Sequence, residues 1–225
     1  MVVHGGFWRR RYGRHLMDAV CADLAARGWA AWNLEYRRVG PRAGGRWPAT
    51  LEDVAAGIDA LTGPIARGVV PPAPVVAIGH SAGGQLALWA AARSGLPDGS
   101  AGARPAVRIT HAVGQAAVAD LALADRLGLG GGAAARMLGA PAARVPDRVA
   151  HASPIERLPL GVPQLLVHGA RDDTVPLAMS ERYVEAARVA GDRAELVAVP
   201  DAGHDDHLDP RSACWAAVTR WLPGP

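Results

Sequence analysis

The stretch Gly79-His80-Ser81-Ala82-Gly83-Gly84 constrains the fold more than any other part of the chain. An apolar run at 75–78 precedes it and a helix-prone run at 85–92 follows it, which predicts a strand, a sharp turn and a helix. Small residues around Ser81 permit a strained turn that holds the serine hydroxyl above a sheet. Because glycine and serine are also common in ordinary loops, the motif is informative only if the rest of the chain supplies partners for the serine.

The composition favours one globular domain. A chain of 225 residues can bury one sizeable core, so we expect a single domain over residues 1–225. Hydrophobic residues make up 50% and charged residues 20% of the chain, and no apolar run is long enough to span a membrane. The formal net charge is only +3, and most arginines are scattered among acids. We therefore expect neither a nucleic acid nor a membrane as a partner.

The chain has two cysteines, Cys21 and Cys214. Neither has the spacing of metal ligands and both lie on the apolar side of a helical pattern, so we expect reduced core thiols, with a single disulfide as the alternative. No histidine and carboxylate cluster has metal-site spacing. The N-terminus shows no charged segment followed by an apolar stretch and a cleavage site. These features predict a cytoplasmic protein without a metal or cofactor.

Strand and helix patterns alternate along most of the chain. Apolar or aromatic-rich runs bounded by glycine and proline predict strands over 2–3, 29–36, 75–78, 107–113, 163–168 and 194–199. Apolar residues at helical spacing predict helices over 16–26, 50–61, 85–92, 177–190 and 210–222. Thr50 and Asp53 have the spacing of a capping box at the start of the second helix. The alternation predicts an α/β fold with a mostly parallel sheet and helices on both faces.

The segment 115–159 departs from this alternation. It is rich in alanine and glycine, contains Gly130-Gly131-Gly132, and has apolar patches of helical size. We expect it to form short helices and loops over one edge of the sheet, as a small cap-like insertion within the single domain.

Two candidate partners for Ser81 follow it in the chain. A serine hydroxyl keeps its proton at neutral pH, so it needs a base and an acid that orients the base. Asp172 lies in a loop after the strand 163–168, and His204 lies in the loop after the strand 194–199. We therefore predict the triad Ser81, Asp172 and His204. Asp173 is the alternative acid and His207 the alternative base; otherwise they would be a loop or capping carboxylate and a surface histidine.

An oxyanion site requires backbone N–H groups aimed at the attacked carbonyl. The amide of Ala82, directly after the serine, can supply one donor. A second should come from a glycine-rich loop near the start of the sheet, and His4-Gly5-Gly6-Phe7-Trp8 occupies that place. We predict that Gly6, Phe7 and Ala82 donate to the oxyanion.

Four motifs together give the chain a family resemblance. They are His4 to Trp8, which reads His-Gly-Gly-x-Trp; the elbow at 79–84; His168-Gly169-x-x-Asp172-x-x-Val175-Pro176; and Gly203-His204. With these motifs in this order, nearly the whole chain resembles the α/β-hydrolase superfamily, in particular its esterase and kynurenine formamidase-like (arylformamidase) group. The resemblance implies hydrolysis of a carboxylic ester or an aryl formamide such as N-formylkynurenine through an acyl-enzyme intermediate, without a cofactor.

The chain departs from the resembled fold at its start. Two further strands normally precede the oxyanion loop in that fold, and here only Val2-Val3 stand before it. Without them, the strand 29–36 would lie at a sheet edge, which favours pairing with another chain. We therefore expect a homodimer or poor solubility.

Residues near the predicted site leave several alternatives open. Phe7, Trp8 and Tyr12 either line the substrate cleft or pack within their loop, and we predict Trp8 and Tyr12 as substrate-binding residues. The arginines at 9–11 and Arg14 either meet a substrate carboxylate or face water. The remaining histidines near strand ends are expected to hold loop backbone by hydrogen bonds; they are His4, His80 and His168.

The combined expectation is a serine hydrolase that acts on a small-molecule ester or amide. Two alternatives remain at the level of sequence. One is a catalytically silent binding protein on the same fold, which the complete triad disfavours. The other is a peptidase-like serine hydrolase, which the lack of a gating domain disfavours.

Overall fold

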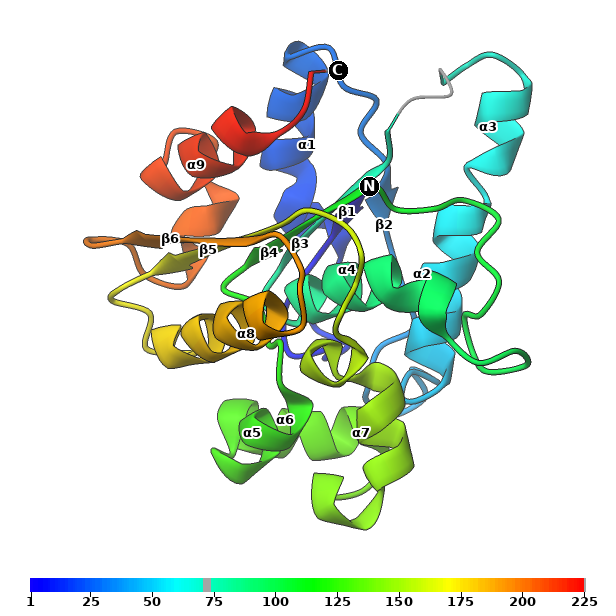
Figure 1. Ribbon diagram of the computed structural model, residues 1–225, viewed down its shortest axis with the longest axis vertical. Coiled ribbons are helices and arrows are strands. Elements are labelled where there is room, and N and C mark those ends of the chain that lie inside the picture. Colours follow the sequence, from blue (N-terminus) through cyan, green and yellow to red (C-terminus); the bar gives the residue numbers. More distant parts are fainter. Residues whose placement is uncertain (71–73, 225) are drawn as a thin grey trace.

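The computed structural model describes residues 1–70 and 74–224, and its centre is one parallel β-sheet (Figure 1). All five neighbouring strand pairs are parallel, in the order β2-β1-β3-β4-β5-β6. The strands are β1 (Val2–Val3), β2 (Asn33–Leu34), β3 (Val76–His80), β4 (His111–Gln115), β5 (Gln164–Gly169) and β6 (Ala194–Val199). The expected α/β architecture with a parallel sheet is confirmed.

Helices cover both faces of the sheet (Figure 1). The α-helices are α1 (Asp18–Ala26), α2 (Ala49–Asp59), α3 (Thr62–Ala66), α4 (Ala82–Ala92), α5 (Leu121–Arg126), α6 (Leu129–Leu138), α7 (Pro146–Ala152), α8 (Leu177–Val189) and α9 (Ala213–Trp221). Short 3₁₀ turns are η1 (Arg14–Met17), η2 (Arg93–Gly95), η3 (Ala142–Arg144), η4 (Pro154–Arg157) and η5 (Asp205–Leu208). Helices α1 and α9 lie on one face, and α2, α4 and α8 lie on the other.

The sheet separates two hydrophobic cores. Along β3, Val76 and Ile78 pack with the core under α1 and α9, whereas Ala77 packs with the core under α4 and α8. Side chains alternate between the two faces of a strand, so a strand covered on both sides is apolar at every position. Every residue of α4 is buried, which makes this helix the centre of the larger core and fixes the serine turn at its N-terminus.

Three local expectations differ from the structure. The segment expected as a strand at 29–36 is the sheet edge, but it pairs only at β2, because β1 offers it two residues. The strand expected at 107–113 begins only at β4, since the amides of Ala106 and Val107 bond to the carboxylate of Asp59 instead. The expected capping box is absent, and Thr50 Oγ1 donates to the Arg37 carbonyl at 2.7 Å.

The segment 115–159 contains α5, α6 and α7, which lie below the sheet in Figure 1. Its three consecutive glycines, Gly130 to Gly132, all have positive φ values between 55° and 79°. Only glycine adopts this left-handed backbone in succession at little cost. The organisation of the chain as one domain with this segment as its insertion stays a prediction.

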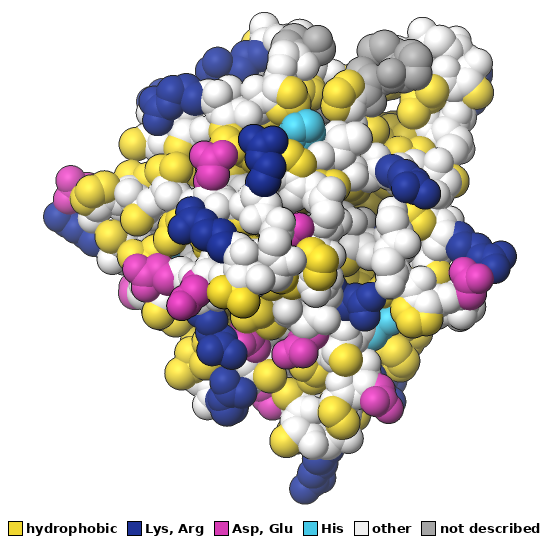
Figure 2. Space-filling view, viewed as in Figure 1, with side chains coloured by type: hydrophobic (Ala, Val, Ile, Leu, Met, Phe, Trp, Pro, Cys, Tyr) yellow, Lys and Arg dark blue, Asp and Glu magenta, His cyan; other side chains and the backbone are white. Residues whose placement is uncertain are grey.

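Three structural observations bear on the expected location and partners of the protein. No helix within the described part of the chain is long and apolar enough to cross a membrane. Cys21 and Cys214 are both free, and burial raises the pKa of each thiol to about 11. Acidic and basic side chains are interspersed on the face shown in Figure 2. Cytoplasmic location, the lack of a nucleic-acid or membrane partner, and a homodimer stay predictions.

Candidate active site

Ser81 lies at the sharp turn between β3 and α4. Its backbone has φ 55° and ψ −119°, a left-handed conformation that is strained for a residue with a side chain. A Cβ atom on Gly79 would overlap the Gly83 carbonyl, and one on Gly83 would overlap the carbonyls of Val3 and His4. The two glycines therefore permit the tight turn that places Ser81 at the carboxyl end of the sheet, as the motif predicts.

The structure brings His204 and Asp172 together. His204 Nδ1 lies 2.7 Å from Asp172 Oδ2, and because a carboxylate only accepts, Nδ1 carries the proton and donates. Nε2 is then left as the proton acceptor, as a catalytic base requires. Ser81 Oγ is buried and has no hydrogen-bond partner among the described residues, and Ser81 and His204 line the same cleft.

Asp172 is held by four donors. Its Oδ1 accepts from the amides of Thr174 and Val175, each at 2.8 Å, and its Oδ2 accepts from His204 and lies 3.2 Å from His168 Nε2. Burial alone would raise the pKa of this carboxyl, but the hydrogen bonds from His168, His204 and Val175 hold its pKa well below the usual range. Asp172 is thus held in a fixed, fully ionised state beside His204.

His168 contributes to the site in a way that the sequence did not reveal. Its Nε2 faces two acceptors, Asp172 Oδ2 and the Val175 carbonyl at 2.9 Å, so Nε2 carries the proton. Its Nδ1 accepts from the Ser180 hydroxyl at 2.8 Å. The contact of His168 with the Val175 carbonyl is the backbone-holding role expected from the sequence. Its second contact, with Asp172, makes His168 a neighbour of the predicted triad. Its position four residues before Asp172 was the available signal.

The two rival residues lie elsewhere. Asp173 is exposed, and its Oδ1 accepts from the Thr174 hydroxyl at 3.1 Å. His207 is fully buried rather than a surface histidine, and neither of its ring nitrogens has a hydrogen-bond partner among the described residues. Burial lowers its pKa well below the usual value. Neither rival has the contacts that Asp172 and His204 share.

His80 supports the loop that carries His204. Its Nε2 lies 2.9 Å from the His204 carbonyl, so Nε2 donates. Burial, followed by the nearby His204, lowers the pKa of His80 to about 3. A neutral His80 thus holds the backbone of the base, which matches the role expected from the sequence.

The oxyanion loop lies directly against the serine. A Cβ on Gly5 would come within 3.0 Å of Ser81 Cβ and 2.7 Å of the His80 carbonyl. Gly6 and Phe7 both have positive φ, at 100° and 51°, and their amides make no hydrogen bond to the described residues. Ala82 is the first residue of α4, so its amide has no partner within the helix. It is one of the free N–H groups at the helix N-terminus, where an anion can bind. That these three amides form the oxyanion site stays a prediction.

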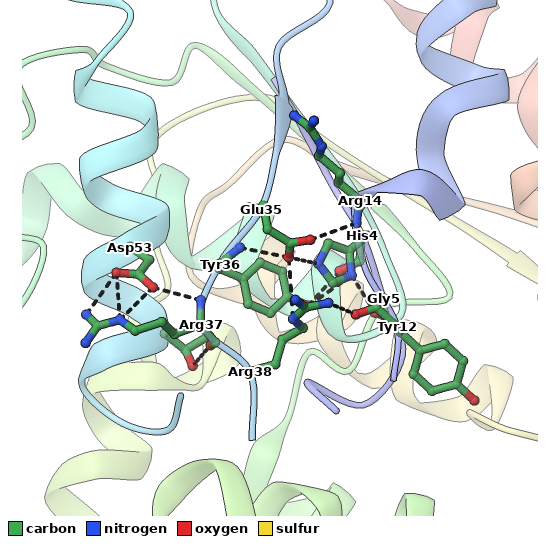
Figure 3. A network of polar contacts seen from close by, with 10 residues as sticks. His4, Gly5, Tyr12, Arg14, Glu35, Tyr36, Arg37, Arg38 and Asp53 are labelled. Atoms are coloured by element: carbon green, nitrogen blue, oxygen red, sulfur yellow. Dashed lines mark hydrogen bonds and ion pairs between the residues drawn. The ribbon is translucent and has the colours of Figure 1, made fainter. Parts of the chain in front are cut away.

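A polar network fixes the start of the oxyanion loop (Figure 3). His4 is buried, its ring stacks on Tyr36 at 4.3 Å, and its Nε2 lies 2.9 Å from Glu35 Oε1. The Tyr36 hydroxyl donates to the His4 carbonyl at 2.9 Å. Arg38 forms an ion pair with Glu35 at 3.6 Å and donates a hydrogen bond to the Tyr12 carbonyl. Burial lowers the pKa of His4, while the Gly5 carbonyl and Glu35 act in the opposite direction. The loop is thereby tied to the segment after β2.

The serine opens into a cleft of about 710 Å³. Phe7 and Tyr12 line it, in agreement with one of the two alternatives from the sequence. Trp8 does not: it is 1% exposed and its indole N–H donates to Gln85 in the core. The prediction that Trp8 binds substrate is therefore wrong, because φ values of 51° and 55° at Phe7 and Trp8 turn the loop between them. Lining residues that the sequence did not indicate are Leu16, Ala19, Thr174, Leu208 and Pro210.

One group of possible metal ligands lies in the described residues. His80, His204 and Asp205 have ligand atoms within 4.8 Å of one another. This group includes the proposed base, and His204 Nδ1 is already bonded to Asp172. A metal held here would compete with the triad, so the geometry assigns these residues to the serine site.

Fold and site together define an α/β-hydrolase with a serine nucleophile elbow, a paired acid and histidine, and an oxyanion loop. The profile of the BD-FAE family matches residues 1–186. The chain belongs to the BD-FAE family.

Two curated relatives share sequence with the chain. Esterase LipC of Mycobacterium tuberculosis is 29% identical over 217 residues, which cover 92% of this chain and 53% of LipC. The 5-methylorsellinic acid synthase of Aspergillus terreus is 39% identical over 77 residues, 32% of this chain and 3% of that protein. The chain therefore spans about half the length of LipC and a small part of the synthase.

Solved structures share the fold at low sequence identity. A truncated carbohydrate esterase from gut microbiota superposes with a TM-score of 0.81 at 22% identity, covering 98% of this chain and 82% of that one. Esterase Est2 of Thermogutta terrifontis superposes with a TM-score of 0.72 at 23% identity, covering 97% of this chain and 77% of Est2. An acetyl ester-xyloside bifunctional hydrolase of Caldicellulosiruptor lactoaceticus superposes with a TM-score of 0.66 at 22% identity, covering 98% of this chain and 76% of that one.

Proposed function

We propose that this protein is a serine esterase that hydrolyses carboxylic esters through an acyl-enzyme intermediate. The observation that carries the proposal is the 2.7 Å bond between His204 Nδ1 and Asp172 Oδ2, beside a strained Ser81 in one cleft. That bond leaves His204 Nε2 free to take a proton from the serine.

The mechanism follows from the arrangement. Ser81 attacks the ester carbonyl, and His204 takes the serine proton and returns it to the leaving alcohol. Amides of Gly6, Phe7 and Ala82 stabilise the oxyanion, and each such donor contributes about 3 kcal/mol to the lowering of the barrier. Water, activated by His204, then releases the acid and regenerates Ser81. Asp172 keeps its negative charge and orients the imidazole throughout.

Esters are favoured over aryl formamides as substrates. LipC and Est2 are named as esterases, and Est2 has been solved with butyrate or propionate bound. We infer that short acyl groups are accepted, and that an aryl formamide such as N-formylkynurenine is the alternative for the same machinery. A silent binding protein would not require a complete triad, whereas a peptidase-like serine hydrolase would use the same triad and is a further alternative.

Labelling with a fluorophosphonate probe and a substrate panel test the proposal. Wild-type protein should be labelled, whereas Ser81→Ala should not, and Ser94→Ala, which alters an exposed serine, should be labelled as wild type. The panel compares p-nitrophenyl esters of two to eight acyl carbons with N-formylkynurenine. Ser81-dependent cleavage of the shorter esters supports the proposal. Equal hydrolysis by Ser81→Ala would overturn it, and cleavage of the formamide alone would replace the substrate class.

A further inference from the structure

Three consecutive arginines after the oxyanion loop point to different places. Arg9 and Arg11 line the cleft that contains Ser81, whereas Arg10 does not and lies 3.3 Å from the Pro41 carbonyl through its Nη1. The segment is a turn, closed by a hydrogen bond from the Tyr12 amide to the Arg9 carbonyl at 3.1 Å, and neighbouring side chains along it leave in different directions. The sequence left open whether these arginines meet a substrate or face water, and the structure separates them.

Both cleft arginines are held in place by aromatic rings of the same cleft. The Arg9 guanidinium lies 5.8 Å from the Phe7 ring centroid, and it also donates to the Gly130 carbonyl. The Arg11 guanidinium lies 4.7 Å from the Tyr12 ring centroid. Contacts of this kind orient a guanidinium without neutralising its charge.

Neither arginine is matched by an acid. Nearby Arg37 and Arg38 form ion pairs with Asp53 and Glu35, but within residues 1–70 and 74–224 neither Arg9 nor Arg11 has an ion-pair partner. Two acids, Asp205 and Asp209, also line the cleft, and both come from the segment that follows His204.

The acids leave the arginine side of the cleft positive. Asp209 forms a bidentate ion pair with Arg211, whose Nε donates to Oδ1 at 3.1 Å and whose Nη2 donates to Oδ2 at 3.0 Å. Asp205 remains as a single negative charge beside the base. A substrate anion would therefore be attracted toward Arg9 and Arg11 and repelled from Asp205, which fixes one orientation of the ester across Ser81.

We propose that the preferred esters carry a carboxylate or similar anionic group, which Arg9 and Arg11 bind beside Ser81. This inference rests on the proposed esterase function and adds the charge of its substrate. Guanidinium groups are suited to it because they present parallel N–H donors that match the two oxygens of a carboxylate.

The test compares esters that differ only in charge. The first pair is 4-acetoxybenzoate and its neutral isostere 4-acetoxybenzamide, with the charge on the leaving group. The second is the p-nitrophenyl monoester of adipic acid and p-nitrophenyl hexanoate, with the charge on the acyl group. The measured quantity is the ratio of kcat/KM for the anionic ester to that for the neutral ester, in wild type and in Arg9→Gln, Arg11→Gln and Arg10→Gln.

We expect the ratio for at least one pair to fall about three- to tenfold in Arg9→Gln and Arg11→Gln, the size of a partly exposed charge-assisted contact. Arg10→Gln should keep the wild-type ratio, and added salt should lower that ratio in the wild type. Unchanged ratios in both arginine variants, or an equal loss on both members of each pair, would overturn the inference while leaving the esterase intact. Absence of Ser81-dependent hydrolysis of every ester would instead reject the esterase function itself.

Discussion

His204 Nδ1 and Asp172 Oδ2 are joined at 2.7 Å, and the Asp172 side chain is fully shielded from solvent. This pair fixes the tautomer of the base, because a carboxylate only accepts, whereas an amide in its place can donate to Nδ1 and so no longer requires a proton there. We expect Asp172→Asn to lower kcat by about 10⁴ with little change in KM, as in other triads that lose the acid. Steady-state kinetics on a short-chain p-nitrophenyl ester measures the effect.

The adjacent Asp173 provides the matched control. It is exposed and its carboxylate contacts only the neighbouring Thr174 hydroxyl among the described residues. Asp173→Asn should retain kcat within about twofold. A loss in Asp173→Asn as large as that in Asp172→Asn would mean that the orienting acid is wrongly assigned.

His168 is expected to act as a positioning residue. It donates to Asp172 Oδ2 and to the Val175 carbonyl, so it holds the same carboxylate oxygen that His204 contacts. His168→Leu removes this donor and should lower kcat about ten- to a hundredfold, the cost typical for losing such a supporting hydrogen bond. His168→Gln, whose amide can still donate, should recover part of kcat.

The pH profile distinguishes positioning from general destabilisation. Loss of the His168 donor removes one of the hydrogen bonds that lower the pKa of Asp172, so in His168→Leu this carboxylate takes up its proton at a higher pH, and kcat at the acidic extreme of the profile should be lost at a higher pH than in wild type. An unshifted profile with reduced kcat in both variants would assign His168 to packing alone.

The oxyanion loop depends on the absence of a side chain at Gly5. An alanine there would place its Cβ 2.7 Å from the His80 carbonyl and 3.0 Å from Ser81 Cβ, so the loop must move away from the serine. We expect Gly5→Ala to lower kcat about 10²- to 10³-fold, the effect of losing an oxyanion donor. Gly95→Ala is the control, because its Cβ would meet no atom within 4 Å. Similar kcat values for the two variants would contradict this placement of the loop.

Much of the fold could be predicted from local patterns. β6 has the bounds expected from its apolar run, since glycine and proline at 191 and 200 bracket it. The bounds of β2 and β4 were harder to predict, because the lengths of these strands depend on partners distant in sequence. Val2–Val3 offer β2 only two positions, and Asp59 captures the amides before β4. Strand type is a local property, whereas strand length is set by pairing.

The residues of the site likewise fall into those that the sequence could predict and those that depend on tertiary packing. Ser81, Asp172 and His204 were predictable because their motifs specify both residue type and the adjoining strand end. Trp8 was misplaced because the sequence does not show the positive φ values that turn its side chain into the core. The buried state of His207 was equally hidden, since it follows from the packing of η5 beside Gln115 and His80.

The edge position of β2 supports the expectation of a homodimer. Among the described residues β2 pairs with β1 alone, so the backbone groups on its other edge can pair with a second chain. We expect light scattering to give a mass that rises with concentration. Ala30→Lys puts a charge at an exposed residue beside β2 and should shift the protein toward monomer, whereas Ala22→Lys on α1 should not. A concentration-independent monomer would rule the dimer out.

Two buried histidines predict how stability depends on pH. Burial lowers the pKa of His80 to about 3 and that of His207 well below its usual value, whereas both would titrate near about 6.5 in the unfolded chain. Below about pH 6.5 the unfolded chain therefore binds protons that the folded protein excludes, and stability falls as pH falls. Each histidine contributes a slope of up to about 1.4 kcal/mol per pH unit. Asp172 adds nothing above about pH 5, because its carboxyl is ionised in both states there, and it adds to the loss of stability only at lower pH.

His207→Phe isolates one of these contributions. Neither ring nitrogen of His207 has a hydrogen-bond partner among the described residues, so an apolar ring should cost little at pH 7.5. At pH 5 the variant should gain about 2 kcal/mol in the free energy of unfolding relative to wild type, because it no longer excludes that proton. Urea unfolding at the two pH values measures this difference, with His15→Phe as an exposed control. Equal pH dependence in wild type and His207→Phe would show that His207 is accessible to protons in the folded protein.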